Sequence, residues 1–64
     1  MLKINKLKEY REKAALSQEK LAEKVQVTRQ TIISIESNRY VPSLELALKF
    51  AKLFKCKVEN IFEI

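Results

Sequence analysis

The sequence predicts an all-α fold of five helices, organised as a single domain over residues 1–64. Apolar residues recur at helical spacing in successive segments. The chain is 47% hydrophobic and contains no Gly and one Pro, so few residues suit tight turns or open strands. A domain of 64 residues lies near the lower limit at which a core supports itself, so oligomerisation would be a natural supplement.

Residues that cap helices well mark most of the expected helix starts. Side-chain oxygens of Asn, Ser and Thr accept hydrogen bonds from first-turn N–H groups, which have no partner within the helix. The fifth helix is the exception, because Lys57 is a poor cap. The expected helices are residues 6–14 after Asn5, a second after Ser17, a third after Thr28, a fourth after Ser43 to about Phe54, and a short fifth from Val58 to Phe62.

The two ends of the chain show a different, period-two pattern. Lys3 lies between two apolar residues at one end, and Glu63 lies between two at the other. Such alternation is typical of strands, so the two ends are candidates for a short antiparallel ribbon. Frayed ends are the alternative, because isolated two-stranded pairs are marginal in water.

The segment Thr28–Ser37 separates into two faces when it is placed on a helix. Thr28, Ile32 and Ile35 fall on one side, and the outward residues are Arg29, Gln30, Ile33, Ser34 and Ser37. A guanidinium and an amide at the N-terminal end of the outward face match the major-groove edges of guanine and adenine. Only two residues separate this helix from the preceding one, which requires a sharp turn. Residues 17–37 are therefore expected to form a helix-turn-helix DNA-binding motif.

Arg11 lies on the apolar stripe of the first expected helix. An unpaired charge removed from water is very costly, so an inward arginine needs a carboxylate partner. Glu36, at the inner edge of the third helix, is the partner we expect. The alternative is an arginine whose stem lies on the surface while its head stays in water.

The fourth expected helix carries more apolar surface than one core requires. Its polar residues Glu45, Lys49 and Lys52 form one narrow stripe, whereas a surface helix of a small monomer needs an apolar stripe of little over about 100°. We therefore expect a homodimer in which a partner subunit covers the excess. The expected interface residues are Leu46, Phe50, Leu53, Ile61 and Ile64.

Composition narrows the functional class. Thirteen basic residues against eight acidic ones give a net charge of +5, which suits an anionic partner but does not choose between DNA, RNA and a lipid surface. The chain has no His, no nucleophile beside a base and no Gly-rich phosphate loop, so neither an enzyme nor a cofactor site is expected. One cysteine excludes an internal disulfide or a multi-cysteine metal site.

Nothing in the sequence suggests a membrane protein or a small-molecule receptor. No apolar run approaches the roughly 20 residues that span a bilayer, and the first residues do not resemble a signal peptide. We therefore expect a soluble, cytoplasmic protein with no membrane partner. No site for a small-molecule ligand is evident in so short a chain.

From Leu7 to Phe62 the sequence resembles the Cro/C1-type (XRE-type) helix-turn-helix transcriptional regulators. The motifs that carry the resemblance are SQEKLA, VTRQTI, an Ile-Glu pair, a Pro-Ser helix restart and a closing Ile-Phe. Each motif alone is weak, but their combination is specific. The chain is most similar to very short stand-alone repressors that end soon after the fifth helix.

The resemblance implies a five-helix, lambda-repressor-like bundle that binds double-stranded DNA as a homodimer, usually at a palindromic operator near a promoter. It implies that Gln18 contacts a phosphate and often braces the third helix, and that Arg11 and Glu36 form an internal ion pair. Helix N-termini, including the one at Ser17, are further candidates for phosphate contacts. Base edges are expected to be contacted by Thr28, Arg29, Gln30 and Ser34, and the DNA backbone by Asn38 and Arg39.

Three positions depart from the family pattern. Gln26 and Ala15 stand where many relatives have Gly, and each would carry roughly 1 kcal/mol of strain if its φ is positive. Ile33 stands at an outward position that is usually polar; it is a candidate for contact with a thymine methyl group, and the alternative is that it packs against the sugar-phosphate edge or stays in water.

Two other functional classes remain as alternatives to a DNA-binding repressor. One is a protein-interaction module, such as an antitoxin-like subunit whose bundle mainly holds a partner protein. An RNA-binding role is disfavoured, because the outward face lacks the aromatic residues that stack single-stranded bases.

Overall fold

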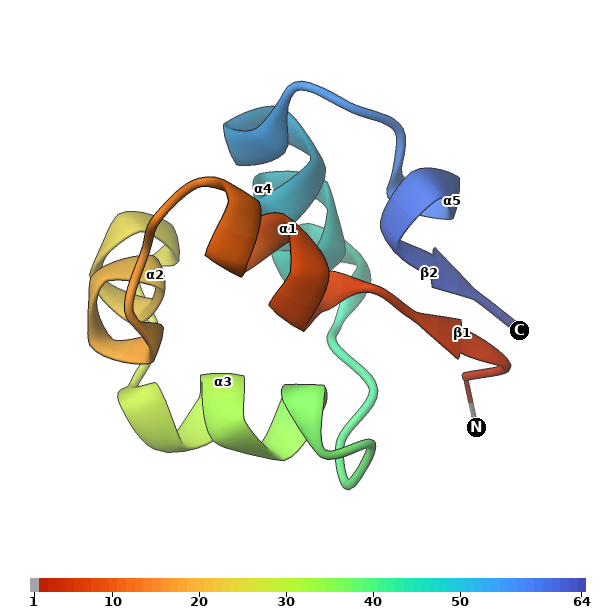
Figure 1. Cartoon of the computed structure of the whole chain (residues 1–64). Coiled ribbons are helices and arrows are strands. Elements are labelled where there is room, and N and C mark those ends of the chain that lie inside the picture. The colour runs from red at the N-terminus through yellow and green to blue at the C-terminus, as the bar shows by residue number, and fades with distance from the viewer. Residues whose placement is uncertain (1) are drawn as a thin grey trace.

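Three helices begin at the capping residues that the sequence predicts. In this computed structural model, which describes residues 2–64, the hydroxyl oxygens of Ser17, Thr28 and Ser43 accept hydrogen bonds from backbone N–H groups in the first turns, at 3.0, 3.3 and 3.2 Å. The elements are β1 (Ile4–Asn5), α1 (Leu7–Lys13), α2 (Gln18–Val25), α3 (Arg29–Glu36), α4 (Leu44–Phe54), α5 (Val58–Ile61) and β2 (Phe62–Glu63). Figure 1 shows α3 along one edge of the bundle, with the two strands side by side.

The start of α1 differs from the prediction. Lys6, not Asn5, occupies the cap position, and Asn5 belongs to β1. The Asn5 amide oxygen still accepts a hydrogen bond from the Leu7 N–H group, at 3.2 Å. The capping interaction is therefore present, but it comes from one residue further upstream.

The predicted ribbon between the two ends is confirmed. Ile4 pairs with Glu63, and Asn5 pairs with Phe62, in antiparallel register. The backbone N–H of Lys6 also donates to the carbonyl oxygen of Ile61, at 2.8 Å. Because Phe62 joins the strand, α5 ends one residue earlier than predicted.

The core corrects the predicted subunit interface. Phe50 and Ile61 are fully buried within their own chain, and Leu46 is nearly so, because α4 packs these side chains against the other helices. They cannot also meet a partner subunit while the chain keeps this fold. Leu53 is half-buried against the same core, and only Ile64 of the five predicted residues is largely exposed.

Four of the residues from 2 to 64 adopt left-handed backbone conformations, and none of them is glycine. Ala15 and Gln26 have φ of 57° and 63°, Asn38 has 63°, and Lys55 has 55°. Each lies in a turn that directly follows α1, α2, α3 or α4. The sequence favours this conformation at Asn38, because Asn is among the residue types that tolerate it well. For Ala15 and Gln26 it gave positive φ only as a condition, and it gave no indication of positive φ at Lys55.

Lys55→Gly is expected to stabilise the fold by about 0.5–1 kcal/mol, because Gly removes the steric cost of positive φ at the end of α4. For a domain of this size, that corresponds to a rise in Tm of a few degrees. Lys55→Ala is the matched control, because it removes the same charge but keeps a Cβ atom at the positive φ. A rise in Tm for both variants, or for neither, would contradict this explanation.

Candidate nucleic-acid interface

The α2-turn-α3 unit is held together by its apolar residues. Leu21, Ala22 and Val25 from α2 are buried in the same core cluster as Ile32 and Ile35 from α3. The turn between the helices spans residues 26–28, and its sharp reversal uses the left-handed conformation of Gln26. The small side chain of Ala22 suits a close approach of the two helices. With its inner face buried, α3 presents its other face outward.

The N-terminal end and the outward face of α3 carry the residues that the family resemblance assigned to base contacts. Thr28, Arg29 and Gln30 are exposed at the N-terminal end of the helix. Ile33 and Ser34 are half-buried, so they are less accessible than the first turn. A partner that approaches this face would meet the Arg29 guanidinium and the Gln30 amide first.

Glu36 joins α3 to both preceding helices. Arg11 Nε donates to one Glu36 carboxylate oxygen at 2.6 Å, and Arg11 Nη2 donates to the other at 3.3 Å. Gln18 Nε2, from α2, donates to the second oxygen as well, at 3.1 Å. The Arg11 residue is only 9% exposed, which favours the inward ion pair over a solvated arginine. This network fixes the C-terminal end of α3 against α1 and α2.

The same network stabilises the charged form of Arg11. The hydrogen bond to Glu36 raises the pKa of Arg11 above its ordinary value, and the charges of Glu36 and Glu12 act in the same direction against the effect of burial. Arg11 Nη1 also donates to the carbonyl oxygen of Leu16 at 2.8 Å, so three nitrogens of the guanidinium have partners. The hydrogen bond from Gln18 to Glu36 braces α3, as the family resemblance implied.

The N-terminal ends of α2 and α3 open onto one depression of about 400 Å³. It is lined by Arg11, Ser17, Gln18, Glu19 and Arg29. The predicted phosphate-contacting residues of α2 therefore share a surface with the first predicted base-reading residue of α3. Glu19 was not predicted there. Its carboxylate would repel an anion in the depression, although its charge interacts favourably with the dipole of α2.

Asn38 and Arg39 lie beyond the opposite end of α3. Asn38 N–H donates to the carbonyl oxygen of Ile35 at 3.0 Å, and Arg39 N–H donates to that of Ser34 at 2.9 Å. These bonds close the helix and leave both side chains exposed. The α3 helix spans eight residues, or about 12 Å. Candidate backbone-gripping groups therefore flank the candidate base-reading face at both ends.

Comparisons with known proteins agree with this geometry. The chain matches the family model described as helix-turn-helix over residues 7–61, which is most of its length. The chain belongs to the Cro/C1-type helix-turn-helix family of transcriptional regulators. It is 59% identical over 58 residues to an uncharacterized HTH-type transcriptional regulator of Methanocaldococcus jannaschii, covering 91% of this chain and 88% of the relative. It is 57% identical over 58 residues to the uncharacterized HTH-type transcriptional regulator YgzD of Bacillus subtilis, with the same coverage of both chains.

Family membership establishes the coarse function. The chain is a DNA-binding regulator of transcription and not an enzyme. Within residues 2–64, no three His, Cys, Asp or Glu side chains lie together in a way that would hold a metal ion. None of the helices described here is both long and apolar enough to cross a bilayer.

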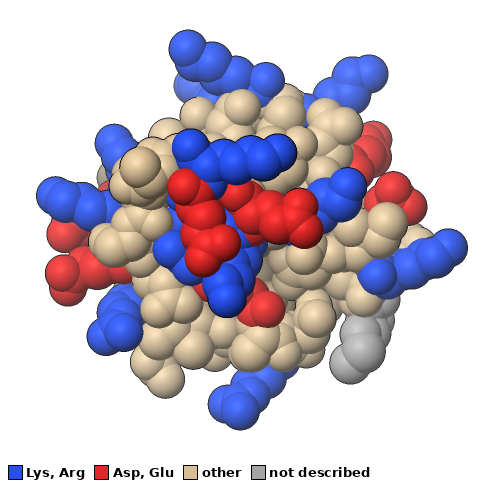
Figure 2. Space-filling view, in the orientation of Figure 1, with Lys and Arg blue, Asp and Glu red and all other residues tan. Residues whose placement is uncertain are grey.

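The charge distribution of this helix-turn-helix regulator suits the polyanion that it binds. From Gln26 to Leu44 the sequence contains a single acidic residue, Glu36, and its carboxylate is already paired. Figure 2 shows acidic side chains gathered in the middle of the viewed face, while the lower edge, along which α3 runs in Figure 1, is mostly uncharged with a projecting basic side chain. The α3 edge therefore lacks the acidic groups that would repel phosphates.

Two residues of this regulator that sequence reasoning missed lie beside the interface. Tyr40 is exposed and lines an open depression of about 320 Å³ with Gln30, Thr31 and Ser34. Asn5, from β1, donates hydrogen bonds to the end of α3 and to Asn38. Neither position leaves a signal in the sequence, because each depends on how separate elements pack and neither residue is a charge on an apolar stripe.

Proposed function

We propose that this regulator is a repressor that binds a palindromic operator as a homodimer and blocks transcription from the promoter. The observation that carries the proposal is the exposed pair Arg29 and Gln30 at the start of an otherwise well-anchored α3. Repression by occlusion needs only a bound dimer over the promoter. We expect the protein to act in the cytoplasm, together with the DNA that it binds.

In this proposal, α3 enters the major groove. Arg29 donates two hydrogen bonds to a guanine, Gln30 pairs with an adenine, and Thr28, Ser34 and Ile33 contact neighbouring base edges. The Glu36 network supports this role, because it fixes the helix on which these side chains stand. Because the backbone of a rigid helix is already fixed, it loses little conformational entropy when the side chains bind the bases.

Contacts at the two ends of α3 would hold the DNA backbone. Ser17 and Gln18 lie at the N-terminus of α2, where free N–H groups and the helix dipole favour a phosphate. Asn38 and Arg39 would grip a second phosphate beyond the other end of α3. Contacts of this kind set the register of the protein on DNA but do not select the sequence.

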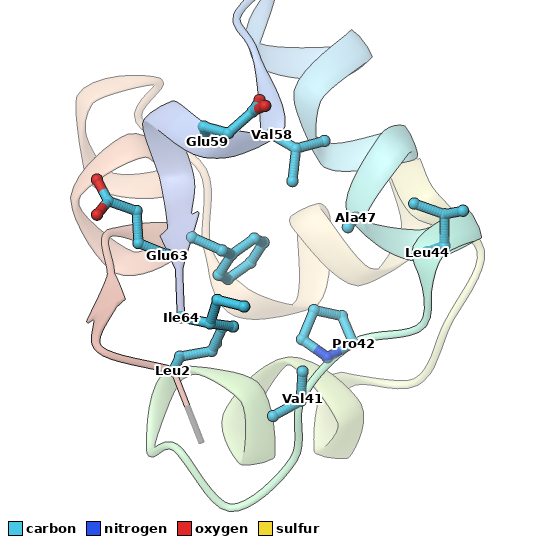
Figure 3. Close-up of a pocket in the computed structure, with 10 residues that line it drawn as sticks. Leu2, Val41, Pro42, Leu44, Ala47, Val58, Glu59, Glu63 and Ile64 are labelled. Atoms are coloured by element: carbon cyan, nitrogen blue, oxygen red, sulfur yellow. The ribbon is translucent and has the colours of Figure 1, made fainter.

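Of the interface residues that the sequence suggested, the surface of the proposed dimer keeps only Ile64. An apolar groove of about 400 Å³ lies between the start of α4, α5 and β2, and Figure 3 shows Val41, Pro42, Leu44 and Val58 around it with the carboxylate of Glu63 directed away from its centre. Leu44 is 73% exposed and Ile64, also in the groove, is 95% exposed. The exposed Leu48 extends this apolar surface along α4.

A second copy of the chain is the occupant that we propose for this groove. Among residues 2–64, four of the five large exposed hydrophobic residues belong to this continuous surface: Val41, Leu44, Leu48 and Ile64. A chain of 64 residues has little core of its own, so burying this surface supplements its stability. A symmetric pair would place two α3 helices about 34 Å apart, one turn of B-DNA.

A gel shift with the DNA upstream of the protein's own gene tests the proposal. Repression at a palindromic operator predicts a shifted band that survives competition by random DNA, and a steep loss of affinity as salt rises. Equal competition by random and upstream DNA would reject sequence-specific binding at that site. In a transcription assay from the same promoter, added protein is expected to lower transcript yield, and an increase would contradict repression.

Arg29→Ala is expected to cost about 1–3 kcal/mol of operator binding and to relax the preference at one base position. The guanidinium is exposed, so the fold should not change. Binding to the operator and to every single-base variant of it is measured by fluorescence anisotropy. Lys24→Ala is the control, because it removes one exposed positive charge from the C-terminal end of α2. Equal weakening on specific and random DNA would reject the base contact.

A further inference from the structure

The amide of Asn5 makes hydrogen bonds in three directions. Its oxygen accepts from the Leu7 N–H at 3.2 Å, and its nitrogen donates to the Ile35 carbonyl oxygen at 2.7 Å and to Asn38 Oδ1 at 3.0 Å. Asn5 also pairs with Phe62 in the two-stranded sheet. One side chain therefore connects the sheet at the chain ends, the start of α1 and the end of α3.

The partners of Asn5 fix the orientation of its amide. A backbone N–H can only donate and a backbone carbonyl can only accept, so the oxygen must face Leu7 and the nitrogen must face Ile35. The two requirements are independent and agree. The remaining N–H of Asn5 then points to Asn38 as a donor.

The orientation of Asn5 in turn fixes the amide of Asn38. Because Asn5 donates, the Asn38 side chain must accept through its oxygen, which directs its NH₂ group away from Asn5. Within residues 2–64, that NH₂ group has no hydrogen-bond partner, and Asn38 is exposed. An NH₂ group offers donors to a phosphate, whereas an outward oxygen would repel one.

We infer that Asn5 is a positioning residue for DNA binding: it orients the Asn38 amide so that its NH₂ group faces a phosphate of the duplex. The inference rests on the proposed contact of Asn38 with the DNA backbone. Asn5 itself need not touch DNA. Its effect passes through Asn38, whose left-handed backbone places the side chain beside the end of α3.

A double-mutant cycle on the full chain tests this coupling. The probe is a fluorescently labelled duplex of mixed sequence, and its affinity is measured by anisotropy over a range of salt concentrations. Asn38→Ala is expected to weaken binding about 2- to 10-fold at every salt concentration. Its salt dependence should stay unchanged, because a neutral amide releases no counterion.

Asn5→Ala is expected to weaken binding by a similar factor in the wild-type background and by less than about 2-fold in the Asn38→Ala background. A purely structural role for Asn5 predicts the same loss in both backgrounds, and that result would overturn the inference. Thermal melts of each variant ensure that affinities are compared between folded proteins.

Asn5→Asp is the second variant in case Asn5→Ala does not fold. It keeps an oxygen for the Leu7 N–H but has no donor for Asn38, so it should lose at least as much affinity as Asn5→Ala. Asn60→Ala and Asn60→Asp are matched controls, because Asn60 Oδ1 accepts from the Lys57 N–H in the same way, on α5 and away from α3 (Figure 1). Wild-type affinity in Asn5→Asp, or an equal loss in Asn60→Asp, would refute the inference.

The outcomes separate this inference from the proposed function. If the wild-type protein binds no duplex, the DNA-binding proposal itself fails. If Asn38→Ala binds as the wild type does, the proposed backbone contact of Asn38 fails. If Asn38→Ala weakens binding and Asn5→Ala does not, the contact stands and the positioning role of Asn5 is wrong.

Discussion

Glu36→Ala is expected to destabilise the fold by about 3–5 kcal/mol, because it leaves the charge of Arg11 buried without its partner. A domain of this length has a total stability of about 3–10 kcal/mol. The variant should therefore be partly or wholly unfolded at room temperature. The loss includes the bond from Gln18, so both helices that precede α3 lose their anchor to its end.

Urea and thermal unfolding followed by circular dichroism measure this effect. Glu23→Ala is the matched control, because Glu23 forms a surface pair with Lys20 at 3.6 Å and its side chain is 61% exposed. That pair should contribute no more than about 0.2–1 kcal/mol. Similar losses for the two variants would mean that the Arg11–Glu36 pair is no more important than a surface pair.

A double replacement distinguishes the cost of an orphaned charge from the value of the pair. Arg11→Met with Glu36→Leu removes both charges and fills the space with apolar atoms, so it should be far less destabilising than Glu36→Ala alone. If the double variant is as unstable as the single one, the instability comes from loss of the hydrogen-bonded network that holds α3 in place. It would then not come from the buried charge of Arg11 that Glu36→Ala leaves without a partner.

The starts of α2, α3 and α4 and the inner face of α3 followed from the sequence, because they depend on residues a few positions apart. The caps at Ser17, Thr28 and Ser43 act within three residues, and Ile32 and Ile35 lie one turn apart. The Arg11 ion pair was also predictable, because a charge on an apolar stripe demands a partner and few carboxylates qualify. Family resemblance then supplied the candidate roles of the outward residues.

The sequence did not determine which face of α4 stays uncovered. It showed correctly that α4 has more apolar directions than one core needs, but the choice depends on where the other helices pack against it. They cover Phe50 and Leu46 and leave Leu44 and Leu48 exposed. The role of Asn5 was hidden for the same reason, because its partner Ile35 lies 30 residues away in the chain.

The exposed remainder of α4 leads to the strongest test of the proposed dimer. Leu44→Asp is expected to convert the protein to a monomer, because it would place a charge in the middle of an apolar interface. The monomer should keep its fold, since Leu44 is the exposed first residue of α4, where an acidic side chain suits the helix dipole. Sedimentation velocity measures the change in mass.

Loss of the dimer should also weaken operator binding by about 10²- to 10⁴-fold, because two linked half-site contacts become separate events.

Leu44→Lys separates this effect from simple charge repulsion. It would also place a charge in the interface, but it adds a positive charge that by itself would strengthen binding to DNA. Monomers that bind poorly in both variants would support the groove as the subunit interface. Dimers that persist in Leu44→Asp would show that a different surface joins the subunits, and wild-type affinity in either monomer would show that the operator is read by one chain alone.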